Sequence, residues 1–350
     1  MEPLTPSPFN ITQNSMRGVG GFCVADSSSA WVKVVDNLAE NVLAAEGRRL
    51  FRRLKAGAFR VLRHPIWLRV LPRTSPQVPL DVPADLIIKG KNDKWIAFDL
   101  QGGRVIRKLA SRELYQQEVW IRTIPEVAAI SPPILKWDPD GLMYVEAYQP
   151  GRPAALHDLD EGMKVLLSLW PRLAAVYKVK TSCAPLDLPK LDQDLALQYV
   201  VREGGLEAAW QRLEGHAVKQ GLLHGDLKHL NILVQKDKLW VIDWGEQFFT
   251  GPPLFDLLYF LYWHTRSFPP EIVINRALAS PGWISDSLPE GLEPLAVEAS
   301  LLVFALEMVK RIGEEGSRKS PLKKLVRFLK AATGRLRELS VNSMEGALWR

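Results

Sequence analysis

Three short segments in the first third of the chain alternate hydrophobic and polar residues. They cover residues 85–89, 95–100 and 104–109, and the turn-forming stretches GKND and QGG separate them. A period of two is typical of strands, and short polar connections favour antiparallel pairing. The pattern therefore predicts a small antiparallel sheet in this part of the chain.

Downstream, hydrophobic residues recur at intervals of three and four, which is typical of helices that bury one face. These segments are residues 157–178, 191–202 and 206–219, and further helices are expected near 298–311 and 321–339. Together with the sheet, they predict an α+β protein in which a small sheet-containing part precedes a larger, mainly helical part.

A second strand pair is predicted within residues 222–245, LLHGDLKHLNILVQKDKLWVIDWG. Asn231 opens one apolar run, a polar stretch follows, and a second apolar run ends at Asp243. Two such runs joined by a short polar loop predict a hairpin, which would bring Asn231 and Asp243 together at its open end. Asp226 lies on the loop that leads into this hairpin.

These three polar residues suit a phosphate-transfer site. Mg²⁺ prefers oxygen ligands and takes few protein groups when it also binds nucleotide phosphates, so Asn231 and Asp243 are predicted metal ligands. In kinases, an Asp five residues before such an Asn orients the substrate hydroxyl and accepts its proton, which assigns that role to Asp226. The alternative is that these side chains are solvated loop residues.

At this stretch, HGDLKHLNIL followed by VIDWG, the chain resembles the aminoglycoside phosphotransferase and choline kinase family of small-molecule kinases. The resemblance covers residues 85–265 and implies a two-lobed protein kinase-like fold, with a small antiparallel N-lobe and a larger helical C-lobe. It also implies ATP and Mg²⁺ as cofactors. The implied reaction moves the γ-phosphate to a hydroxyl of a sugar, amino alcohol, aminoglycoside or lipid head group.

The resemblance further implies an ion pair at the nucleotide. The third strand offers Lys108 to contact the α- and β-phosphates, because Ile106 and Lys108 share one strand face as in the A-x-K pattern of kinases. Arg107 is the competing assignment. The helix after this strand offers Glu118 as the partner of Lys108, with Glu113 as the alternative.

Two more stretches are expected to contact the nucleotide. Gly90, in the GKND turn, would let the backbone approach the phosphates closely. The stretch GLMYVEAYQPG resembles the strand and hinge that join the two lobes, so backbone groups near Glu146 to Tyr148 are expected to hold the adenine.

Two residues near Asp226 extend the resemblance. Lys228 follows Asp226 by two positions, as in the H-R-D-L-K pattern of protein kinases, and would neutralise charge on the γ-phosphate in the transition state. The alternative is an exposed loop lysine. Asp256 heads an apolar helix and is expected to tie down the catalytic loop.

The pattern around Lys228 raises an atypical protein kinase as an alternative function, and a nucleotide-binding scaffold without turnover as another. Only residues 244–255 separate Asp243 from Asp256, which is short for a segment that docks a peptide. A scaffold is disfavoured because the base, the Asn and the metal-binding Asp are all present. A small-molecule acceptor is therefore preferred.

The net charge of +6 is concentrated in one region. Nine basic residues and no acid lie between Gly47 and Leu80, so the rest of the chain is net negative. Over residues 48–63, helical spacing places apolar residues on one side and basic residues on the other. We expect this helix to dock on the protein core. An anionic membrane surface is the second interpretation and nucleic acid a weaker third.

The chain carries two cysteines, Cys23 and Cys183, which do not indicate a disulfide framework and favour a reducing compartment. The first ten residues, MEPLTPSPFN, lack the basic and then apolar pattern of an export signal. The sequence contains no run of eighteen apolar residues, so it predicts no membrane span. The expected location is the cytoplasm, with peripheral attachment to the inner face of a membrane as the alternative.

These features divide the chain into four parts. They are a flexible leader over residues 1–30, a basic helical extension with a Pro-rich linker over 31–80, a kinase N-lobe over 81–149 and a kinase C-lobe over 150–350.

Overall fold

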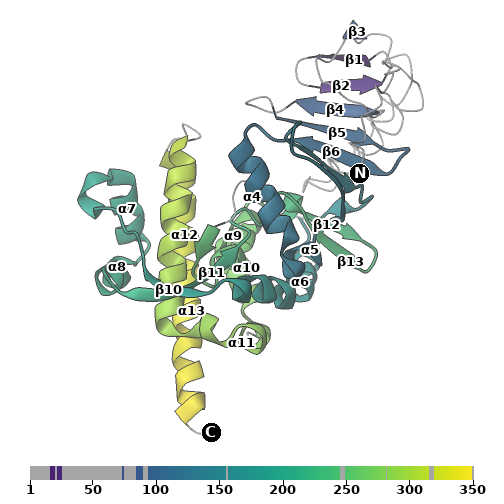
Figure 1. The fold of residues 1–350 in the computed structure, drawn as a ribbon. Coiled ribbons are helices and arrows are strands. Elements are labelled where there is room, and N and C mark those ends of the chain that lie inside the picture. Colours follow the sequence, from purple (N-terminus) through teal and green to yellow (C-terminus); the bar gives the residue numbers. More distant parts are fainter. Residues whose placement is uncertain are drawn as a thin grey trace, which may run out of the picture. The chain divides into compact units, whose positions relative to one another are not determined.

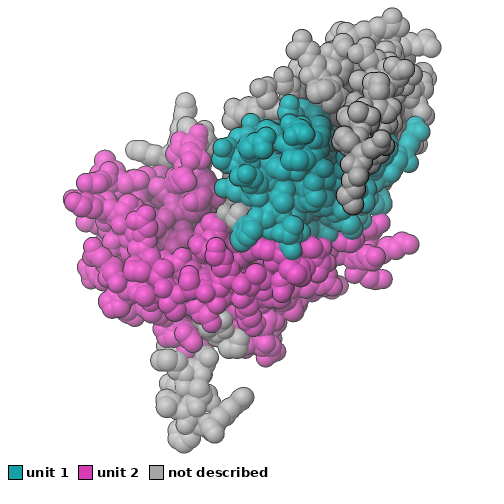
Figure 2. Space-filling model, viewed as in Figure 1, with its two compact units in different colours: residues 1–123, 131–152 teal, residues 124–130, 153–350 magenta. Residues whose placement is uncertain are grey.

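The computed structural model describes most of the chain in two compact units (Figure 2). The described residues are 16–19, 22–25, 73–74, 84–89, 94–154, 157–244, 249–280, 282–314 and 319–348. Unit 1 comprises those within 1–123 and 131–152, and unit 2 comprises those within 124–130 and 153–350. Among the helices described, none is both long and apolar enough to cross a membrane.

Unit 1 is built on an antiparallel sheet of eight strands in the order β3-β1-β2-β4-β5-β6-β8-β7 (Figure 1). The strands are β1 (Met16–Val19), β2 (Phe22–Ala25), β3 (Arg73–Thr74), β4 (Leu86–Lys89), β5 (Trp95–Asp99), β6 (Arg104–Lys108), β7 (Ile134–Asp138) and β8 (Met143–Ala147). One helix of this unit, α4 (Arg112–Thr123), follows β6. The three strands predicted from alternation are confirmed as β4, β5 and β6, each paired with the next.

The two faces of this sheet carry different side chains. Lys108 is in register with Trp95 and Met143, while Arg107 is in register with Tyr144. Successive strand residues point to opposite faces. Lys108 therefore shares a face with the apolar cluster around Trp95 and Ile106, and Arg107 shares the other face with Tyr144. Tyr144 packs there with residues of α4 and the segment around it.

Two segments of the predicted flexible leader, residues 1–30, form strands. Met16–Val19 and Phe22–Ala25 pair as a hairpin, and β2 continues the sheet by pairing with β4. The sequence signal for this was the pair Gly20-Gly21 between two short apolar segments, a combination that favours two-residue hairpin turns. The predicted basic helix over 48–63 lies outside the described residues.

Unit 2 is mainly helical. Its helices are α5 (Pro125–Ala128), α6 (Leu159–Val179), α7 (Leu195–Glu203), α8 (Glu207–Leu213), α9 (Phe255–His264), α10 (Pro270–Ala277), α11 (Gly282–Ser287), α12 (Pro294–Glu314) and α13 (Lys319–Leu348), with short 3-10 helices η1 (Leu191–Gln193), η2 (His229–Asn231) and η3 (Pro289–Leu292). The helices predicted over 157–178, 191–202, 298–311 and 321–339 are confirmed in α6, η1 with α7, α12 and α13. Long helices α12 and α13 pack along each other (Figure 1).

The helix expected over 206–219 is wrong in its second half. Helix α8 ends at Leu213, and a strand begins at Ala217. Between them Gly215 has φ +73°, a backbone conformation that glycine adopts without steric cost and that ends helices. The strand that follows leads directly into the HGD motif, so this break sets where the motif lies.

Short strands complete unit 2. They are β10 (Ser182–Pro185), β11 (Ala217–Leu223), β12 (Ile232–Gln235), β13 (Lys238–Val241) and β14 (Phe249–Gly251), with β9 (Arg152–Pro153) at the boundary of the units. Strand β11 is central in a sheet of order β10-β11-β14. Helix α9 is buried from Phe255 to Leu261, so it forms core on all sides rather than along one stripe. The loop between β11 and β12 starts from this rigid base.

Candidate active site

The predicted hairpin after the HGD motif is confirmed. Strands β12 and β13 pair with Ile232 opposite Val241, and the N–H of Ile242 donates to the carbonyl of Asn231 at 2.9 Å. Asn231 and Asp243 therefore meet at the open end of the hairpin. Asn231 is buried, whereas Asp243 is exposed and has φ +65°, an uncommon conformation for a residue other than glycine.

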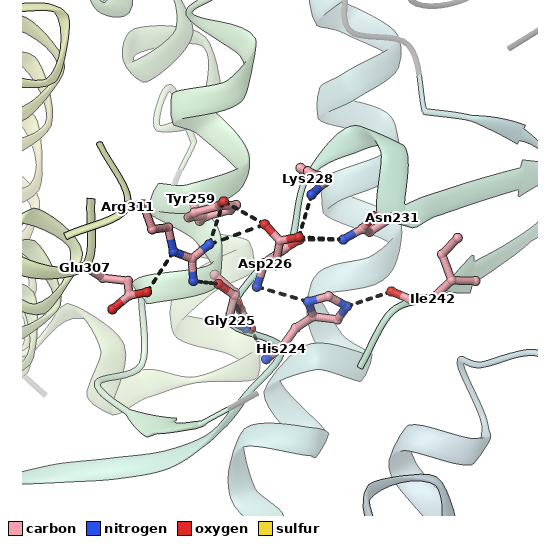
Figure 3. Close-up of polar contacts among 10 residues, drawn as sticks. His224, Gly225, Asp226, Lys228, Asn231, Ile242, Tyr259, Glu307 and Arg311 are labelled. Carbon is pink, nitrogen blue, oxygen red and sulfur yellow. Dashed lines mark hydrogen bonds and ion pairs between the residues drawn. The ribbon is translucent and has the colours of Figure 1, made fainter. Parts of the chain in front are cut away.

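Asp226 is the centre of the polar contacts in this region (Figure 3). Its Oδ2 accepts hydrogen bonds from Lys228 Nζ at 2.5 Å and Asn231 Nδ2 at 3.0 Å. Its Oδ1 accepts one from the Tyr259 hydroxyl at 2.7 Å and lies 3.4 Å from Arg311 Nη1. Burial alone raises the pKa of the Asp226 carboxyl, but the bonds from Lys228 and Tyr259 outweigh it and hold the pKa below its ordinary value. Asp226 is therefore a carboxylate held in one orientation.

The oxygens of Asn231 and Asp243 fit a magnesium ion. Asn231 Nδ2 donates both to the carbonyl and to the carboxylate of Asp226, so Oδ1 is the oxygen of this amide that remains as an acceptor. No group of three or more His, Cys, Asp or Glu gathers within the described residues. Two hard oxygen ligands suit an ion that takes its other ligands from water and nucleotide phosphates.

Asp256 holds the backbone of the loop that carries the HGD motif. Its two carboxylate oxygens accept the N–H groups of His224 at 2.8 Å and Gly225 at 2.9 Å. The His224 ring spans the loop, because Nδ1 accepts the N–H of Asp226 and Nε2 donates to the carbonyl of Ile242. The supporting role expected for Asp256 is confirmed.

Sequence analysis missed two residues that contact the carboxylate of Asp226, namely Tyr259 on α9 and Arg311 on α12. Arg311 Nη1 donates to the Tyr259 hydroxyl at 2.7 Å, and Nη2 donates to the carbonyl of Gly225 at 2.8 Å. Arg311 Nε is in turn held by Glu307 at 2.7 Å, one helical turn earlier. The spacing of Glu307 and Arg311 was visible in the sequence, but their position beside the loop was not.

The ion pair expected between Lys108 and Glu118 is not formed. The cation on the face of β6 that meets the acidic side chains is Arg107. Arg107 Nε lies 2.7 Å from Glu146 Oε1. Lys108 lies on the opposite face of β6, because alternate strand residues point in opposite directions. Glu118 instead accepts the Tyr144 hydroxyl at 3.0 Å and lies 3.9 Å from Arg122 Nη1. The expected pairing of Lys108 with Glu118 is therefore wrong, while the contact of Lys108 or Arg107 with the phosphates stays a prediction.

Glu118 is the inward-facing acid of α4, and Glu113 is not. Glu113 lies exposed in the first turn of the helix, where its pKa is lowered by backbone hydrogen bonding. Glu118 is buried, and burial raises the pKa of its carboxyl to about 7 despite the nearby Arg122 and Arg107. Arg122 also lies 3.2 Å from Glu146, so the two acids and two arginines form one buried network.

Two backbone N–H groups of the stretch expected to hold adenine, residues 146–148, form hydrogen bonds within the protein. The N–H of Ala147 donates to the carbonyl of Pro133 at 2.9 Å, and the N–H of Tyr148 donates to that of Gly103 at 2.8 Å. The side chain of Glu146 belongs to the buried network. Gly90 lies outside the described residues.

Comparisons with known proteins agree with this architecture. The model of the phosphotransferase enzyme family matches residues 42–285. A search of curated proteins finds no match. The match to the family model confirms the resemblance inferred from the HGD motif, and with it the protein kinase-like α+β fold that the resemblance implied.

Several solved structures are similar at low sequence identity. A choline/ethanolamine kinase family protein from Mesorhizobium loti is 16% identical, with 75% of this chain and 95% of that chain covered and a TM-score of 0.45. The choline kinase LicA from Streptococcus pneumoniae is 13% identical, with 72% and 93% covered and a TM-score of 0.45. An aminoglycoside phosphotransferase from Alicyclobacillus acidocaldarius is 10% identical, with 79% and 99% covered and a TM-score of 0.42.

Proposed function

The chain belongs to the phosphotransferase enzyme family, and from that premise we propose that it transfers the γ-phosphate of ATP to a hydroxyl of a small molecule, with Mg²⁺ as the metal. In this reaction the hydroxyl oxygen forms a bond to the γ-phosphorus, the bond from that phosphorus to the bridging oxygen of ADP breaks, and the hydroxyl proton leaves. Asp226 is the proposed acceptor of that proton.

The observation that carries the proposal is the set of donors around Asp226. Four groups approach its two oxygens, from Lys228, Asn231, Tyr259 and Arg311, at 2.5 to 3.4 Å. Phosphoryl transfer depends mainly on positioning and on electrostatic stabilisation. A carboxylate with so many donors keeps one orientation, which supports a role in aligning the attacking hydroxyl.

Lys228 and the metal ligands supply the remaining roles in this proposal. Lys228 carries a positive charge beside Asp226 and would stabilise charge that develops on the transferring phosphate. Asn231 Oδ1 and the Asp243 carboxylate would hold Mg²⁺, which supplies positive charge to the nucleotide phosphates. The amicoumacin kinase hAmiN, one of the similar structures, was solved with AMP-PNP and Ca²⁺.

The test is turnover of γ-labelled ATP by the purified chain. The acceptors are pooled sugars, sugar acids, amino alcohols, aminoglycosides and lipid extracts, and the labelled product is identified. Asp226→Asn should lower the transfer rate by roughly 10² to 10⁴-fold, the usual contribution of a general base, while nucleotide affinity stays close to that of the wild type. Asp243→Ala in the same assay should weaken nucleotide binding only when Mg²⁺ is present.

A matched control is Asp237→Asn, which changes an exposed carboxylate in the turn of the same hairpin and should keep the full rate. Full activity of Asp226→Asn would refute the assigned base. Label on protein rather than on a small molecule would favour an atypical protein kinase. Binding of Mg²⁺ and ATP without transfer to any acceptor would favour a scaffold.

A further inference from the structure

Positive charge gathers beside Asp226, around the Trp263 ring on α9. Lys228 Nζ lies 5.8 Å from the centroid of this ring, and the guanidinium carbon of Arg266 lies 3.5 Å from it. A cation this close to the face of an indole is attracted by the ring quadrupole. Trp263 thus holds two cations, one of which also contacts the proposed base.

A third cation reaches the same area from α13. Lys324 Nζ lies 5.8 Å from the ring centroid of Tyr262, the residue before Trp263. Burial and then Arg266 lower the pKa of the Lys324 ammonium. Arg266 thus adds to the positive potential at Lys324, beyond the effect of burial.

This arrangement constrains the acceptor. The carboxylate of Asp226, which contacts Lys228, is also shared with Tyr259, Asn231 and Arg311. Because Lys228 contacts Asp226 and also lies beside the Trp263 ring, an acceptor whose hydroxyl meets Asp226 would have Lys228 and this ring within reach of its other groups. An anionic substituent would be attracted there, and an ammonium group would be repelled.

We infer that the acceptor is an anionic hydroxyl compound, in which a carboxylate or phosphate accompanies the reacting hydroxyl and is bound by Arg266 and Lys324. The inference rests on the proposed phosphotransferase function and specifies its substrate class. It distinguishes this chain from the choline and ethanolamine kinases among the similar structures, whose named substrates are cations.

The test compares acceptors matched in size but different in charge, in the transfer assay with γ-labelled ATP and Mg²⁺. The pairs are glucuronate with glucose and glycerol 3-phosphate with glycerol. Choline and an aminoglycoside serve as cations, and phosphatidylglycerol vesicles present the same chemistry on a lipid. The anionic member of each pair should have the larger kcat/KM by roughly tenfold or more, the scale of one charge-assisted hydrogen bond. Soluble acids and vesicles then separate a free metabolite from a lipid head group.

Variants assign the preference to the named cations. Lys324→Met and Arg266→Gln should each raise KM for the anionic acceptor several-fold and leave kcat/KM for its neutral partner and the affinity for ATP unchanged. The matched control is Lys323→Met, which removes an exposed charge from the adjacent position of α13 and should behave as wild type. Because Arg266 is exposed, its variant keeps the test valid if Lys324→Met fails to fold.

Three results would overturn the inference in different ways. Better transfer to choline or an aminoglycoside than to any anionic acceptor would reject it and leave the phosphotransferase function intact. Binding of Mg²⁺ and ATP with no transfer to any acceptor would reject the function itself. Equal losses of activity for neutral and anionic acceptors in both variants would also reject the inferred acceptor class, because the two cations would then support the fold and not bind the acceptor.

Discussion

In unit 1, Glu118 and Glu146 share Arg107 and Arg122 in a network whose carboxylates are only 3% exposed, whereas in unit 2 the carboxylate of Asp226 remains 14% exposed. Both networks contain carboxylates, arginines and a tyrosine hydroxyl, and the one in unit 2 adds Lys228 and Asn231. The pKa values of Glu118 and Asp226 nevertheless shift in opposite directions, because burial raises the pKa of Glu118 to about 7 and hydrogen bonds lower the pKa of Asp226.

The number of donors explains the difference. Asp226 receives hydrogen bonds on both oxygens, while Glu118 receives one from Tyr144 and has its cation at 3.9 Å. Donors that reach an ionised group stabilise its charge, and burial without enough donors disfavours it. We therefore expect the network in unit 1 to stabilise the fold, while the one in unit 2 keeps a partly exposed negative group, as the proposed base requires.

The largest expected effect is a loss of unfolding free energy when the buried network of unit 1 is broken. Glu146→Leu leaves Arg107 and Arg122 without the carboxylate they share, and breaking a buried pair in this way costs about 3 to 5 kcal/mol. Urea unfolding should show the loss. Glu271→Leu is the matched control, because it removes an exposed carboxylate paired with Arg327 and should change the midpoint little. Equal midpoints for the two variants would show that the buried network does not hold unit 1 together.

The second effect is on catalysis. Arg311→Met removes the contacts to Gly225, Tyr259 and Asp226 without touching the proposed substrate, so kcat should fall roughly 10- to 100-fold through misalignment while KM for ATP is unchanged. The acid limb of the pH–rate profile should also move to higher pH, because a positive charge beside Asp226 is lost.

Arg311→Lys should recover part of this loss, since it restores the charge but not the two-pronged geometry. Arg327→Met, which removes an exposed arginine, serves as control. An unchanged pH profile in Arg311→Met would show that Arg311 acts on the fold and not on Asp226.

The smallest effect concerns pH and Glu118. Because the folded pKa of about 7 lies above the ordinary value of 4.5, the folded state holds a proton that the unfolded state has lost between these pH values. The contribution of this group to stability is therefore complete below pH 4.5 and declines as pH rises towards 7. Glu118→Gln should remove that decline, which melting temperatures measured from pH 5 to pH 8 would detect.

His229 acts in the opposite sense, because its pKa is lowered to about 4. Its contribution is present above the ordinary pKa of 6.5 and is lost as pH falls towards 4. Because wild type and Glu118→Gln both carry His229, the difference between their melting temperatures at each pH cancels the contribution of His229. A difference that does not change with pH would show that Glu118 is already ionised in the folded protein.

The sequence predicted the strands β4 to β6, most helices of unit 2 and the hairpin of the catalytic loop, because each depends on local periodicity or on turns between neighbouring segments. It failed where a local signal was weak or was overlooked. The hairpin of β1 and β2 lies within the predicted leader, and α8 ends before Gly215, inside the helix predicted over 206–219.

Local sequence was enough to bring Asn231 and Asp243 of the proposed site together, because residues at the two ends of one hairpin meet when that hairpin forms. Only the tertiary structure decided that Arg107 and not Lys108 faces the acids of unit 1, since one residue of strand register moves a side chain to the opposite face. It likewise decided that Arg311 reaches Asp226 from 85 residues away. Packing of distant helices sets such contacts, and no spacing along the chain encodes them.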